Sequence, residues 1–448
     1  MKLFAHQERA VRIARKIPKF LFAWDCGTGK TIGMLSVCDA LPMRTVVVCP
    51  KSIMGPAWAR DATNFPTIRT KILAASSKAQ RKANILANDW DIGVINFDQF
   101  KSEIDTLNRA NIRRLIVDES SKMKNHEAAI TKALIGFADK CESVYLLSGT
   151  PAPNSVTEYW AQIRAIRRDL SGDLYWSWAH RYATAQRRKV WKGGQSRDVI
   201  EGWSQTPSQR AALESMLSSC SWSLRKEDAI DIPKQHDVVV RFPLEDEADH
   251  YHRALKALRI EIGELSSVKI NAEAALMKLR QICGGFVIVA GTPCKIGNTK
   301  LAVLDETLEQ IGNNPCVIWA EFRHEIDAVR GLCEARGESV AFIDGRTSGE
   351  SGEIAARFQA GDIRRLVCHP AAAGHGITLT AASYAVYYSL GFSYELYKQS
   401  RDRIHRAGQT KPCTYYILSA EDTVDEGCLR VVRNKGTAAD ALAQALAV

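Results

Sequence analysis

The chain has 448 residues, 46% of them hydrophobic and 25% charged, a balance that excludes a disordered protein and suits two globular domains. Its formal charge of +10 is compatible with a polyanionic partner such as nucleic acid. No apolar stretch is long enough for a signal peptide or a membrane span, and the twelve cysteines never form a Cys-x-x-Cys pair. We therefore expect a cytoplasmic monomer with no zinc site, no disulfides and no membrane partner.

Short apolar runs alternate with helix-length segments in two regions of the chain. Runs of this length suit strands that are buried on both faces of a parallel sheet, and the alternation implies βαβ units. The sequence predicts an α/β fold with two tandem lobes, residues 1–235 and 236–448. The runs are Phe20–Ala23, Thr45–Cys49, Ile92–Ile95, Leu115–Val117 and Val144–Leu147 in the first lobe, and Cys316–Ala320, Val340–Ile343, Leu366–Cys368 and Ala385–Tyr388 in the second.

Buried-strand runs become scarce between the two regions, and helical patterns such as Tyr251–Leu265 and Ala272–Leu279 replace them. We predict a helical insertion at about 155–225 in the first lobe and a helical protrusion at about 245–285 in the second.

The first chemical motif follows the first apolar run. Gly27-Thr28-Gly29-Lys30-Thr31 stands between that run and a helix-like segment, Ile32–Ala40. Glycines let backbone N–H groups surround phosphate oxygens, and the helix N-terminus adds partial positive charge. Lys30 would reach the β- and γ-phosphates of ATP, and the Thr31 hydroxyl would bind Mg²⁺. Trp24 stands where the full phosphate-loop pattern has glycine, so the loop alone is a weak signal.

An acidic pair, Asp118 and Glu119, directly follows another apolar run. One carboxylate, assigned to Asp118, would hold Mg²⁺, and the other would polarise the attacking water. A solvated loop explains any single Asp-Glu pair equally well, but a phosphate loop followed by an acidic pair is the order found in nucleotide hydrolases. After the next run, Ser148 and Thr150 of Ser148-Gly149-Thr150-Pro151 are able to hydrogen-bond the acidic pair, although a simple turn also explains them.

The segment Gln399–Gln409, far along the chain, contains three arginines, of which Arg403 and Arg406 are the candidate site residues. On a helix, Gln399, Arg403 and Arg406 would share one face, because they stand at positions i, i+4 and i+7. Such a face suits a polyphosphate, and arginines from a second lobe would stabilise the charge that develops during phosphoryl transfer. For three residues alone, a solvated polar face is the simpler explanation.

Together these segments resemble the superfamily-two helicases, and more closely the Swi/Snf-type translocases of double-stranded DNA. The resemblance covers nearly the whole chain and rests on motifs in a fixed order. In chain order they are Phe4 with His6-Gln7, Thr45–Ile53 with Trp58, Asp118–Ser121 with Lys124-Asn125, Ser148–Pro151 with Asn154, Trp222–Lys226, Ile232–Lys234, Leu279–Cys283, Ile318–Phe322, Ile343–Gly345, Ala373–Leu379, Gln399–Gln409 and Thr423–Glu426.

The resemblance implies two RecA-like lobes that bind ATP between them and move along DNA by closing and opening. It implies that Gln7 reads the adenine, with Gln399 among the nucleotide-binding residues. Gly374 and Gly376 would join Ser148 and Thr150 in coupling nucleotide state to movement. Nucleic acid would contact Pro50, Lys51, Arg323 and Thr378.

Ser121 stands where the family has histidine, a change that would weaken coupling between DNA binding and hydrolysis. The Asp-Glu-Ser start and the Ser-Gly-Thr-Pro-Ala segment resemble the annealing-helicase branch, which rewinds DNA. With no chromatin-reading or zinc module evident, we expect a minimal bacterial or phage enzyme that uses ATP and Mg²⁺ to move on double-stranded or branched DNA. The alternatives are a strand-separating DNA or RNA helicase and an ATP-regulated clamp with little turnover.

Residues 175–203 mix aromatic and basic side chains. Such a mixture suits a surface that holds phosphates while aromatic rings stack on bases. A small helical subdomain with a tryptophan core and a solvated basic rim explains it equally well. On the first interpretation, Arg187, Arg188 and Lys189 contact DNA phosphates.

Overall fold

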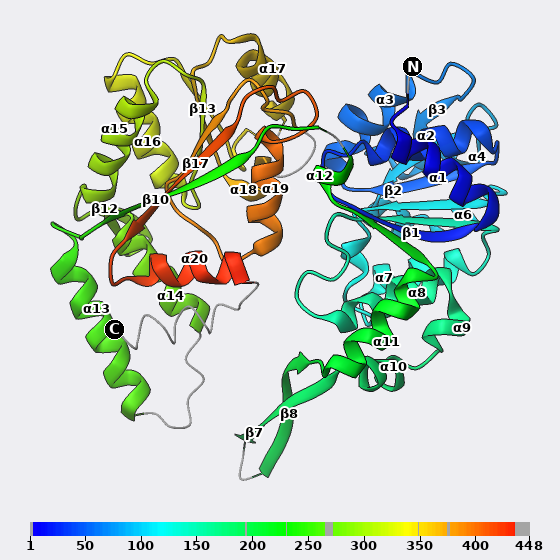
Figure 1. Cartoon of the computed structure of the whole chain (residues 1–448), viewed down its shortest axis with the longest axis horizontal. Coiled ribbons are helices and arrows are strands. Elements are labelled where there is room, and N and C mark those ends of the chain that lie inside the picture. The colour runs from blue at the N-terminus through cyan, green and yellow to red at the C-terminus, as the bar shows by residue number, and fades with distance from the viewer. Residues whose placement is uncertain are drawn as a thin grey trace. The chain divides into compact units, whose positions relative to one another are not determined.

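The computed structural model describes residues 3–192, 195–229, 231–264, 272–347, 349–373 and 377–434. The chain forms two compact units, unit 1 (Met1–Asp231) and unit 2 (Ile232–Val448) (Figure 1). The division falls between residues 231 and 232, whereas the sequence placed it between 235 and 236.

Unit 1 is built on a seven-stranded sheet in which all neighbouring strands are parallel. Its strand order is β3-β4-β2-β5-β6-β1-β9. The strands are β1 (Lys19–Trp24), β2 (Thr45–Cys49), β3 (Thr70–Ile72), β4 (Ile92–Asn96), β5 (Arg114–Asp118), β6 (Ser143–Leu147) and β9 (Ser221–Leu224). The five predicted runs of this lobe form β1, β2, β4, β5 and β6, and the α/β prediction is confirmed. The short strands β3 and β9 were not predicted.

Both faces of this sheet are buried, because successive residues of each strand pack into different cores. Val47 lies in a core with residues of α1 and α2, whereas Val46 and Val48 lie in a core with residues of α7 and α8. The helices of this unit are α1 (Ala5–Lys16), α2 (Lys30–Ala40), α3 (Arg60–Ala62), α4 (Lys78–Leu86), α5 (Phe97–Ser102), α6 (Ile104–Asn108), α7 (Ala129–Ala138), α8 (Tyr159–Ile166), α9 (Arg168–Ser171), α10 (Tyr175–Tyr182), α11 (Pro207–Ser218) and α12 (Lys226–Ala229), with the short turns η1 (Lys51–Ile53), η2 (Met54–Ala59), η3 (Ser120–Met123) and η4 (Val156–Glu158).

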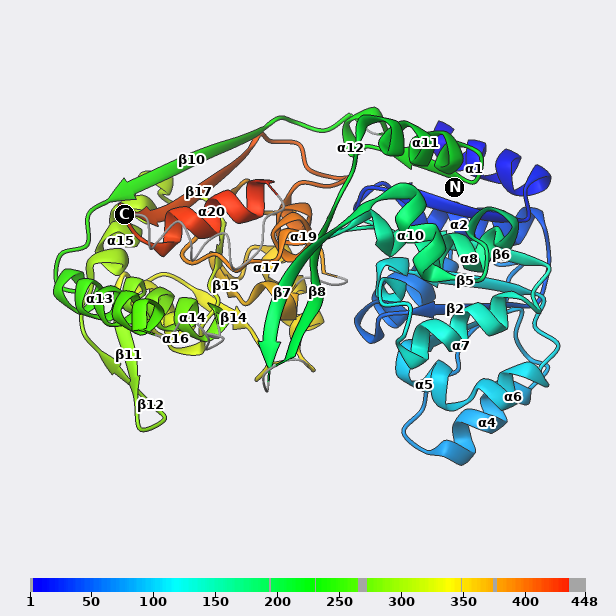
Figure 2. The same cartoon turned by 90° about the horizontal axis from the view of Figure 1, so that it is seen from below.

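The insertion predicted as helical is only partly so. Helices α8 to α11 are present, but between α10 and α11 the chain forms an antiparallel hairpin of β7 (Thr184–Lys192) and β8 (Gln195–Ser204). Figures 1 and 2 show these two strands extending as a ribbon away from the helices of unit 1. The two strands are separated in the sequence by a Gly-Gly pair, a common hairpin signal that outweighed the helical interpretation.

Unit 2 is built on a six-stranded parallel sheet with the order β10-β17-β16-β13-β15-β14. The four predicted runs form β13 to β16, and the predicted helical patterns correspond to α13 and α14. The edge strand β10 and its neighbour β17 were not predicted. The elements are β10 (Gln235–Phe242), α13 (Ala248–Glu264), α14 (Ala272–Cys283), the antiparallel pair β11 (Phe286–Val289) and β12 (Thr292–Lys295), α15 (Thr299–Ile311), β13 (Cys316–Trp319), α16 (Arg323–Ala335), β14 (Val340–Ile343), α17 (Ser351–Ala360), β15 (Arg365–Cys368), α18 (Pro370–Ala373), β16 (Tyr384–Tyr387), α19 (Tyr394–Ile404), β17 (Cys413–Ala420) and α20 (Val424–Asn434).

The cysteines are mostly buried, as small hydrophobic residues would be: all but Cys26 and Cys294 lie in the interior. Within the part of the chain that the structure describes, no helix combines the length and the apolar character needed to cross a bilayer.

Candidate functional site

The predicted phosphate loop connects β1 to α2, as a phosphate-binding loop requires. Gly27 and Gly29 have φ angles of +81° and +77°, in the left-handed region that side chains other than glycine adopt only with strain. The Lys30 ammonium donates to the carbonyl oxygens of Trp24 at 2.9 Å and Asp25 at 3.4 Å. Thr31 follows in the first turn of α2 and is half-buried. This positive end of a helix is suited to an anion.

Two side chains of α1 hold the loop from one side. The Gln7 amide donates to the Gly29 carbonyl at 3.1 Å and accepts from the Phe4 backbone N–H at 2.9 Å. The His6 ring contacts the Thr28 carbonyl through Nε2 at 2.8 Å. A Cβ atom at Gly29 would lie 2.6 Å from the Gln7 amide nitrogen, so this approach requires glycine. Gln7, predicted from the resemblance to read a base, thus lies against the phosphate loop.

Trp24, which stands where the full phosphate-loop pattern has glycine, is the last residue of β1. Its ring is fully buried and packs against His6, Phe22 and Trp222. A Cβ atom at Gly33 would lie 3.2 Å from this ring, which accounts for a glycine inside α2. The departure therefore fills the core beneath the loop and leaves Gly27–Thr31 free to curve.

The segment that closes unit 1 braces the loop from the other side. The Asp25 backbone N–H donates to the Leu224 carbonyl at 3.0 Å, and its carboxylate accepts from the Lys226 backbone N–H at 3.1 Å. The Trp222 ring meets the Trp24 ring edge-on, with 5.2 Å between centroids. The phosphate loop is thus held by residues some two hundred positions later in the chain.

Asp118 ends β5 and is buried. Its carboxylate accepts from the Trp58 indole N–H at 3.0 Å and from the Glu119 backbone N–H at 3.0 Å. Burial and the adjacent Glu119 charge raise the pKa of Asp118 to about 6, while the Lys30 charge and the Trp58 hydrogen bond oppose that rise. The Lys30 charge acts on Asp118, and both residues follow or end strands at the carboxyl edge of the same parallel sheet. The predicted phosphate-binding cation and the predicted metal-binding carboxylate therefore lie at one edge of that sheet.

Glu119 occupies a strained backbone conformation, with φ +59° and ψ +54°. A non-glycine residue in this region costs about 1 kcal/mol or more. The side chain is half-buried, and the strain is located where the chain leaves β5 for η3. The predicted water-polarising residue is thus held by its surroundings in a conformation that it would not choose alone.

A buried glutamine connects the acidic pair to the Ser148–Pro151 motif. Gln162 of α8 is fully buried; its Oε1 accepts from the Ser120 hydroxyl at 2.8 Å, and its Nε2 donates to the Pro151 carbonyl at 2.7 Å. The predicted direct hydrogen bonds from Ser148 and Thr150 to the acidic pair are not among the contacts of the described residues. Ser148 instead accepts from the Thr150 backbone N–H at 3.1 Å.

The same motif also touches the phosphate loop. A Cβ atom at Gly149 would lie 3.3 Å from both the backbone nitrogen and the sulfur of Cys26, so the two backbones pack closely only because Gly149 lacks a side chain. One motif is therefore in contact with the phosphate loop directly and, through Gln162, with Ser120, the residue that follows the acidic pair. Ser121, which replaces the family's histidine, is buried.

The predicted arginines of unit 2 come together, but not on one helix face. Helix α19 ends at Ile404, so Arg406 lies beyond it and the predicted i+7 relation is wrong. His405 has a non-helical ψ of 87°, and its ring bonds the Pro233 carbonyl at 2.7 Å and the Gln235 side chain at 2.9 Å, which stabilises the exit from the helix.

Both guanidinium groups nevertheless bind one carbonyl. Arg403 and Arg406 donate to the Ile377 carbonyl at 3.2 Å and 3.3 Å. Arg403 is buried and also donates to the Gln399 carbonyl at 3.1 Å, whereas Arg406 is half-buried. The Gln399 side chain donates to Glu395 at 3.3 Å, and its buried Oε1 has no hydrogen-bond partner among the described residues.

The other predicted residues lie at the ends of strands or on the surface. Pro50 is half-buried and Lys51 exposed, directly after β2; Arg323 is exposed at the start of α16. Thr378 is half-buried, and Gly374 and Gly376 lie outside the described residues. Contacts to nucleic acid at any of these positions stay a prediction, as they do for the exposed Arg187, Arg188 and Lys189 of the hairpin.

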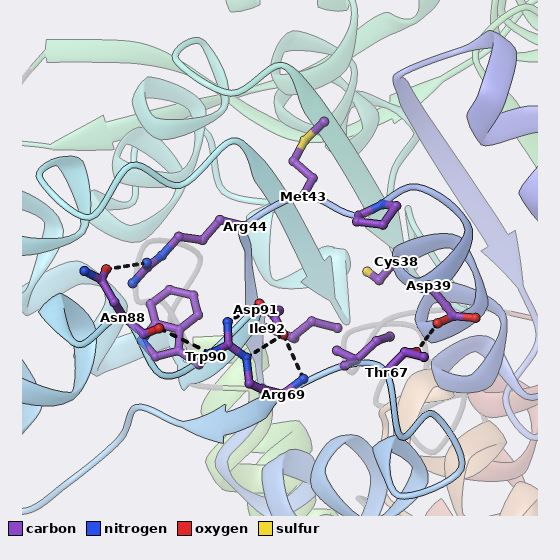
Figure 3. A pocket seen from close by; sticks show the side chains of 12 residues that line it. Cys38, Asp39, Met43, Arg44, Thr67, Arg69, Asn88, Trp90, Asp91 and Ile92 are labelled. Atoms are coloured by element: carbon purple, nitrogen blue, oxygen red, sulfur yellow. Dashed lines mark hydrogen bonds and ion pairs between the residues drawn. The ribbon is translucent and has the colours of Figure 1, made fainter.

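A separate pocket of about 250 Å³ lies at the amino ends of β2 and β4, opposite the end of the sheet that carries the phosphate loop (Figure 3). Its charged side chains bind their neighbours. Arg69 pairs with Asp91 at 2.7 Å and holds the pKa of that carboxyl below its usual value, while Arg44 lies 4.0 Å above the Trp90 ring. We assign this pocket no part in the candidate site.

Sequence reasoning missed two residues that complete the site. Trp58 belongs to the motifs quoted for the resemblance, but its bond to Asp118 was not predicted; a buried indole N–H needs an acceptor, and that rule was the available signal. Gln162 gave no signal, because a lone glutamine in a helix pattern is ordinary.

Two family models match the chain. Residues 6–285 match the SNF2-related domain family, and residues 299–408 match the helicase conserved C-terminal domain. Similar proteins include a Caenorhabditis elegans homolog of SWI/SNF-related matrix-associated actin-dependent regulator of chromatin subfamily A-like protein 1 (26% identity over 97% of this chain), putative protein p41 of Acyrthosiphon pisum secondary endosymbiont phage 1 (25% over 94%) and the mouse DNA annealing helicase and endonuclease ZRANB3 (24% over 95%).

The chain spans 61% of the Caenorhabditis elegans protein, 93% of the phage protein and 39% of the mouse protein. A solved structure, the Sulfolobus solfataricus SWI2/SNF2 ATPase core in complex with dsDNA, is 21% identical and has a TM-score of 0.46, with 99% of this chain and 94% of that chain covered.

The two matched domains together are those of a nucleic-acid-stimulated ATP hydrolase, and the two parallel sheets agree with the RecA-like lobes that the resemblance implied. The SNF2-related match alone covers more than half of the sequence, so the chain belongs to the SNF2-related family of superfamily-two helicase-type ATPases.

Proposed function

We propose that the protein uses Mg²⁺-dependent ATP hydrolysis to move along double-stranded DNA and to remodel or anneal branched DNA. The observation that carries the proposal is geometric: Lys30 of the phosphate loop follows β1 and Asp118 ends β5, so both lie at the carboxyl edge of one parallel sheet in which only β6 separates the two strands. The family match supports the hydrolysis, and the resemblance to a DNA annealing helicase supports the DNA track. The similarity to a phage protein over nearly its whole length supports the cytoplasm of a bacterial or phage-infected cell.

The residues of unit 1 fit a nucleoside triphosphate and its Mg²⁺ ion. Backbone N–H groups of Gly27–Thr31 would bind phosphate oxygens, and Lys30 would exchange its carbonyl partners for the β- and γ-phosphates. Thr31 and Asp118 would hold Mg²⁺, which neutralises charge on the phosphates when bound. Glu119 would orient the attacking water, and Gln7 with Gln399 would contact the nucleotide.

Arg403 and Arg406 of unit 2 would neutralise the charge that develops on the transferred phosphoryl group. Ser148, Thr150, Gly374 and Gly376 would couple hydrolysis to movement. Pro50, Lys51, Arg323 and Thr378 would contact the DNA backbone. Lys51 and Arg323 supply cations, Arg323 also begins helix α16, and Thr378 supplies a small hydroxyl group, all of which suit phosphate contacts.

Comparing ATP turnover in the presence of duplex DNA, single-stranded DNA and RNA tests this function. We expect duplex DNA to stimulate turnover most. Greatest stimulation by RNA would replace the proposal with an RNA helicase, and absence of turnover on every nucleic acid would replace it with an ATP-regulated clamp.

Nucleotide binding should depend on pH through Asp118. Below a pH of about 6 its carboxyl is protonated in the free protein and is a poor metal ligand, so affinity for Mg–ATP should fall about tenfold per pH unit. Titrations from pH 8 to 5 measure this. Trp58→Phe removes a hydrogen bond that stabilises the carboxylate, so the inflection should move to higher pH; an inflection that does not move contradicts the assignment.

Gln162 should affect the rate of ATP hydrolysis although it does not itself bind the nucleotide. Gln162→Leu breaks the link from Ser120 to Pro151 and should lower kcat about tenfold or more, with little change in KM for ATP. Gln162→Glu keeps an acceptor for Ser120 but loses the donor to Pro151, and Ser120→Ala breaks only the other half. If all three variants lose kcat to the same extent and thermal stability to the same extent, Gln162 has only a structural role.

A further inference from the structure

Helix α10 and the β7–β8 hairpin carry a surface on which exposed aromatic and basic side chains are mixed, and the proposed ATP site uses none of them. Trp176 is 52% exposed, an unusual position for so large an apolar ring. Arg187, Arg188 and Lys189 are exposed on β7. Together these residues form what we call the hairpin surface.

The strand geometry puts cations on both faces of the hairpin. Arg187 pairs with Ile200, Arg188 with Val199 and Lys189 with Asp198. Successive residues of a strand point to opposite faces, so Arg187 and Lys189 share one face and Arg188 lies on the other. Asp198 offsets part of the charge on the first face. A thin two-stranded ribbon that is basic on both faces suits two phosphate backbones that diverge from each other.

Trp176 suits an unpaired base. Bases within a duplex are already stacked on each other, whereas a base at a fork or branch has a free face on which an indole can stack. Arg181 is exposed on the same helix, and a cation next to an aromatic ring is the usual composition of surfaces that bind unpaired nucleic acid.

The hairpin surface is connected to the acidic-pair loop, by which we mean residues 118–125, through a row of aromatic rings. We call this row, which consists of Trp203, Trp176, Tyr175 and His126, the aromatic stack. Trp203 at the end of β8 lies 6.2 Å from Trp176, measured between ring centroids, and Trp176 lies 5.1 Å from Tyr175. Tyr175 stacks on His126 at 3.6 Å and an interplanar angle of 9°. His126 directly follows Lys124-Asn125, the residues that resemble the end of the family's acidic box.

A second connection runs through α8. Trp160 meets the rings of both His126 and Tyr175 edge-on, at 5.9 Å and 5.8 Å. Two residues further along the same helix, Gln162 binds Ser120 of the acidic box. A shift of the hairpin surface would therefore move residues that touch the acidic box from two directions.

We propose that the hairpin surface binds the branch point of DNA, with Trp176 stacked on an unpaired base and the hairpin cations on the diverging backbones. The aromatic stack then transmits occupancy of the branch point to the acidic-pair loop and raises ATP turnover. This inference rests on the proposed function and adds to it a preferred substrate, a duplex with a fork, and the element that detects it.

The binding part is tested with a forked duplex and a blunt duplex of equal length and sequence. The wild type should bind the fork more tightly, and Trp176→Ala should bring the two affinities to the same value while duplex-stimulated ATP turnover persists. Because Trp176 is half exposed, this variant should fold. A wild type without fork preference, or a variant that keeps it, overturns the proposal; loss of all DNA-stimulated turnover in the wild type would instead overturn the proposed function.

The hairpin cations are tested by salt dependence. Replacing Arg187, Arg188 and Lys189 with glutamine should weaken fork binding. The slope of log affinity against log salt concentration should become shallower by the amount that corresponds to the loss of up to about three phosphate contacts. Lys101→Gln, Lys132→Gln and Lys140→Gln, at exposed positions of α5, α7 and the turn after α7, remove the same number of charges elsewhere on unit 1. An unchanged slope for the hairpin variant, or an equal change in the control, overturns the proposal.

The transmission part is tested with His126→Leu, which removes the stacked ring beside the acidic-pair loop but leaves the hairpin surface intact. Fork binding should remain tighter than duplex binding, whereas the ratio of kcat with fork to kcat with duplex should fall to about one. A merely structural role would lower both kcat values and leave their ratio unchanged, and that result would contradict transmission.

Discussion

Replacing Lys30 with alanine should lower ATP hydrolysis on the order of a thousandfold and should leave DNA binding in place. The ammonium group is held by the carbonyl oxygens of Trp24 and Asp25, and a triphosphate offers it stronger, charged acceptors at the same end of α2. Removing a preorganised cation from developing phosphate charge is among the largest single losses that a substitution produces.

Steady-state turnover on duplex DNA measures the effect, and DNA affinity without nucleotide shows that the variant is folded. Lys51→Ala, which replaces an exposed lysine after β2, serves as the control: its DNA affinity should fall, while its turnover at saturating duplex DNA should stay near the wild-type value. Turnover by Lys30→Ala within tenfold of the wild type would exclude the phosphate loop as the site of hydrolysis.

Arg406→Ala should lower kcat by about 10³–10⁵, the range observed when an arginine that stabilises phosphoryl transfer is lost. The two arginines should differ, because their burial differs. Arg403 is buried and bonded to the carbonyls of Gln399 and Ile377, whereas Arg406 is half-buried and also donates to the Ile377 carbonyl. We expect Arg406 to act on the phosphate and Arg403 to act there while also holding Ile377 in place.

Thermal unfolding combined with single-turnover kinetics separates these roles. Arg406→Ala should keep the wild-type melting temperature and lose kcat, whereas Arg403→Ala should lose both. Lysine at position 406 should restore little activity, since it lacks the planar fork of donors. Near-normal kcat in Arg406→Ala would show that Arg406 supplies no charge to the reaction.

Most of the strands that the sequence predicted are buried on both faces. In β2, β4, β5 and β6 every residue is buried, and each strand contains an apolar run. The edge strand β14 is only partly buried, but all four of its residues are apolar, so it was predicted as well. The edge strand β10 begins with three polar residues and is exposed over its first four, and two of the four residues of β9 are serines. The hairpin was missed because its strands face solvent rather than a hydrophobic core, so their sequences lack the apolar pattern of a core strand.

The candidate site divides in the same way. Lys30, Asp118 and the two arginines could be proposed from the sequence, because Lys30 and Asp118 stand next to glycines or a strand end and the arginines stand in a motif of the resemblance. The bonds from Trp58 to Asp118 and from Gln162 to Ser120 and Pro151 join distant segments through single hydrogen bonds, and no local pattern encodes them. The predicted face of Gln399, Arg403 and Arg406 failed at one point, because the ring of His405 is used to end the helix.

Displacement of a third DNA strand from a duplex tests most directly whether the protein moves along double-stranded DNA, because this assay reports such movement without strand separation. The protein should release the third strand in an ATP-dependent reaction, leave the underlying duplex paired, and lose the activity in Lys30→Ala. If ATP is hydrolysed and the third strand stays bound, or if the duplex itself is separated, movement along double-stranded DNA is contradicted.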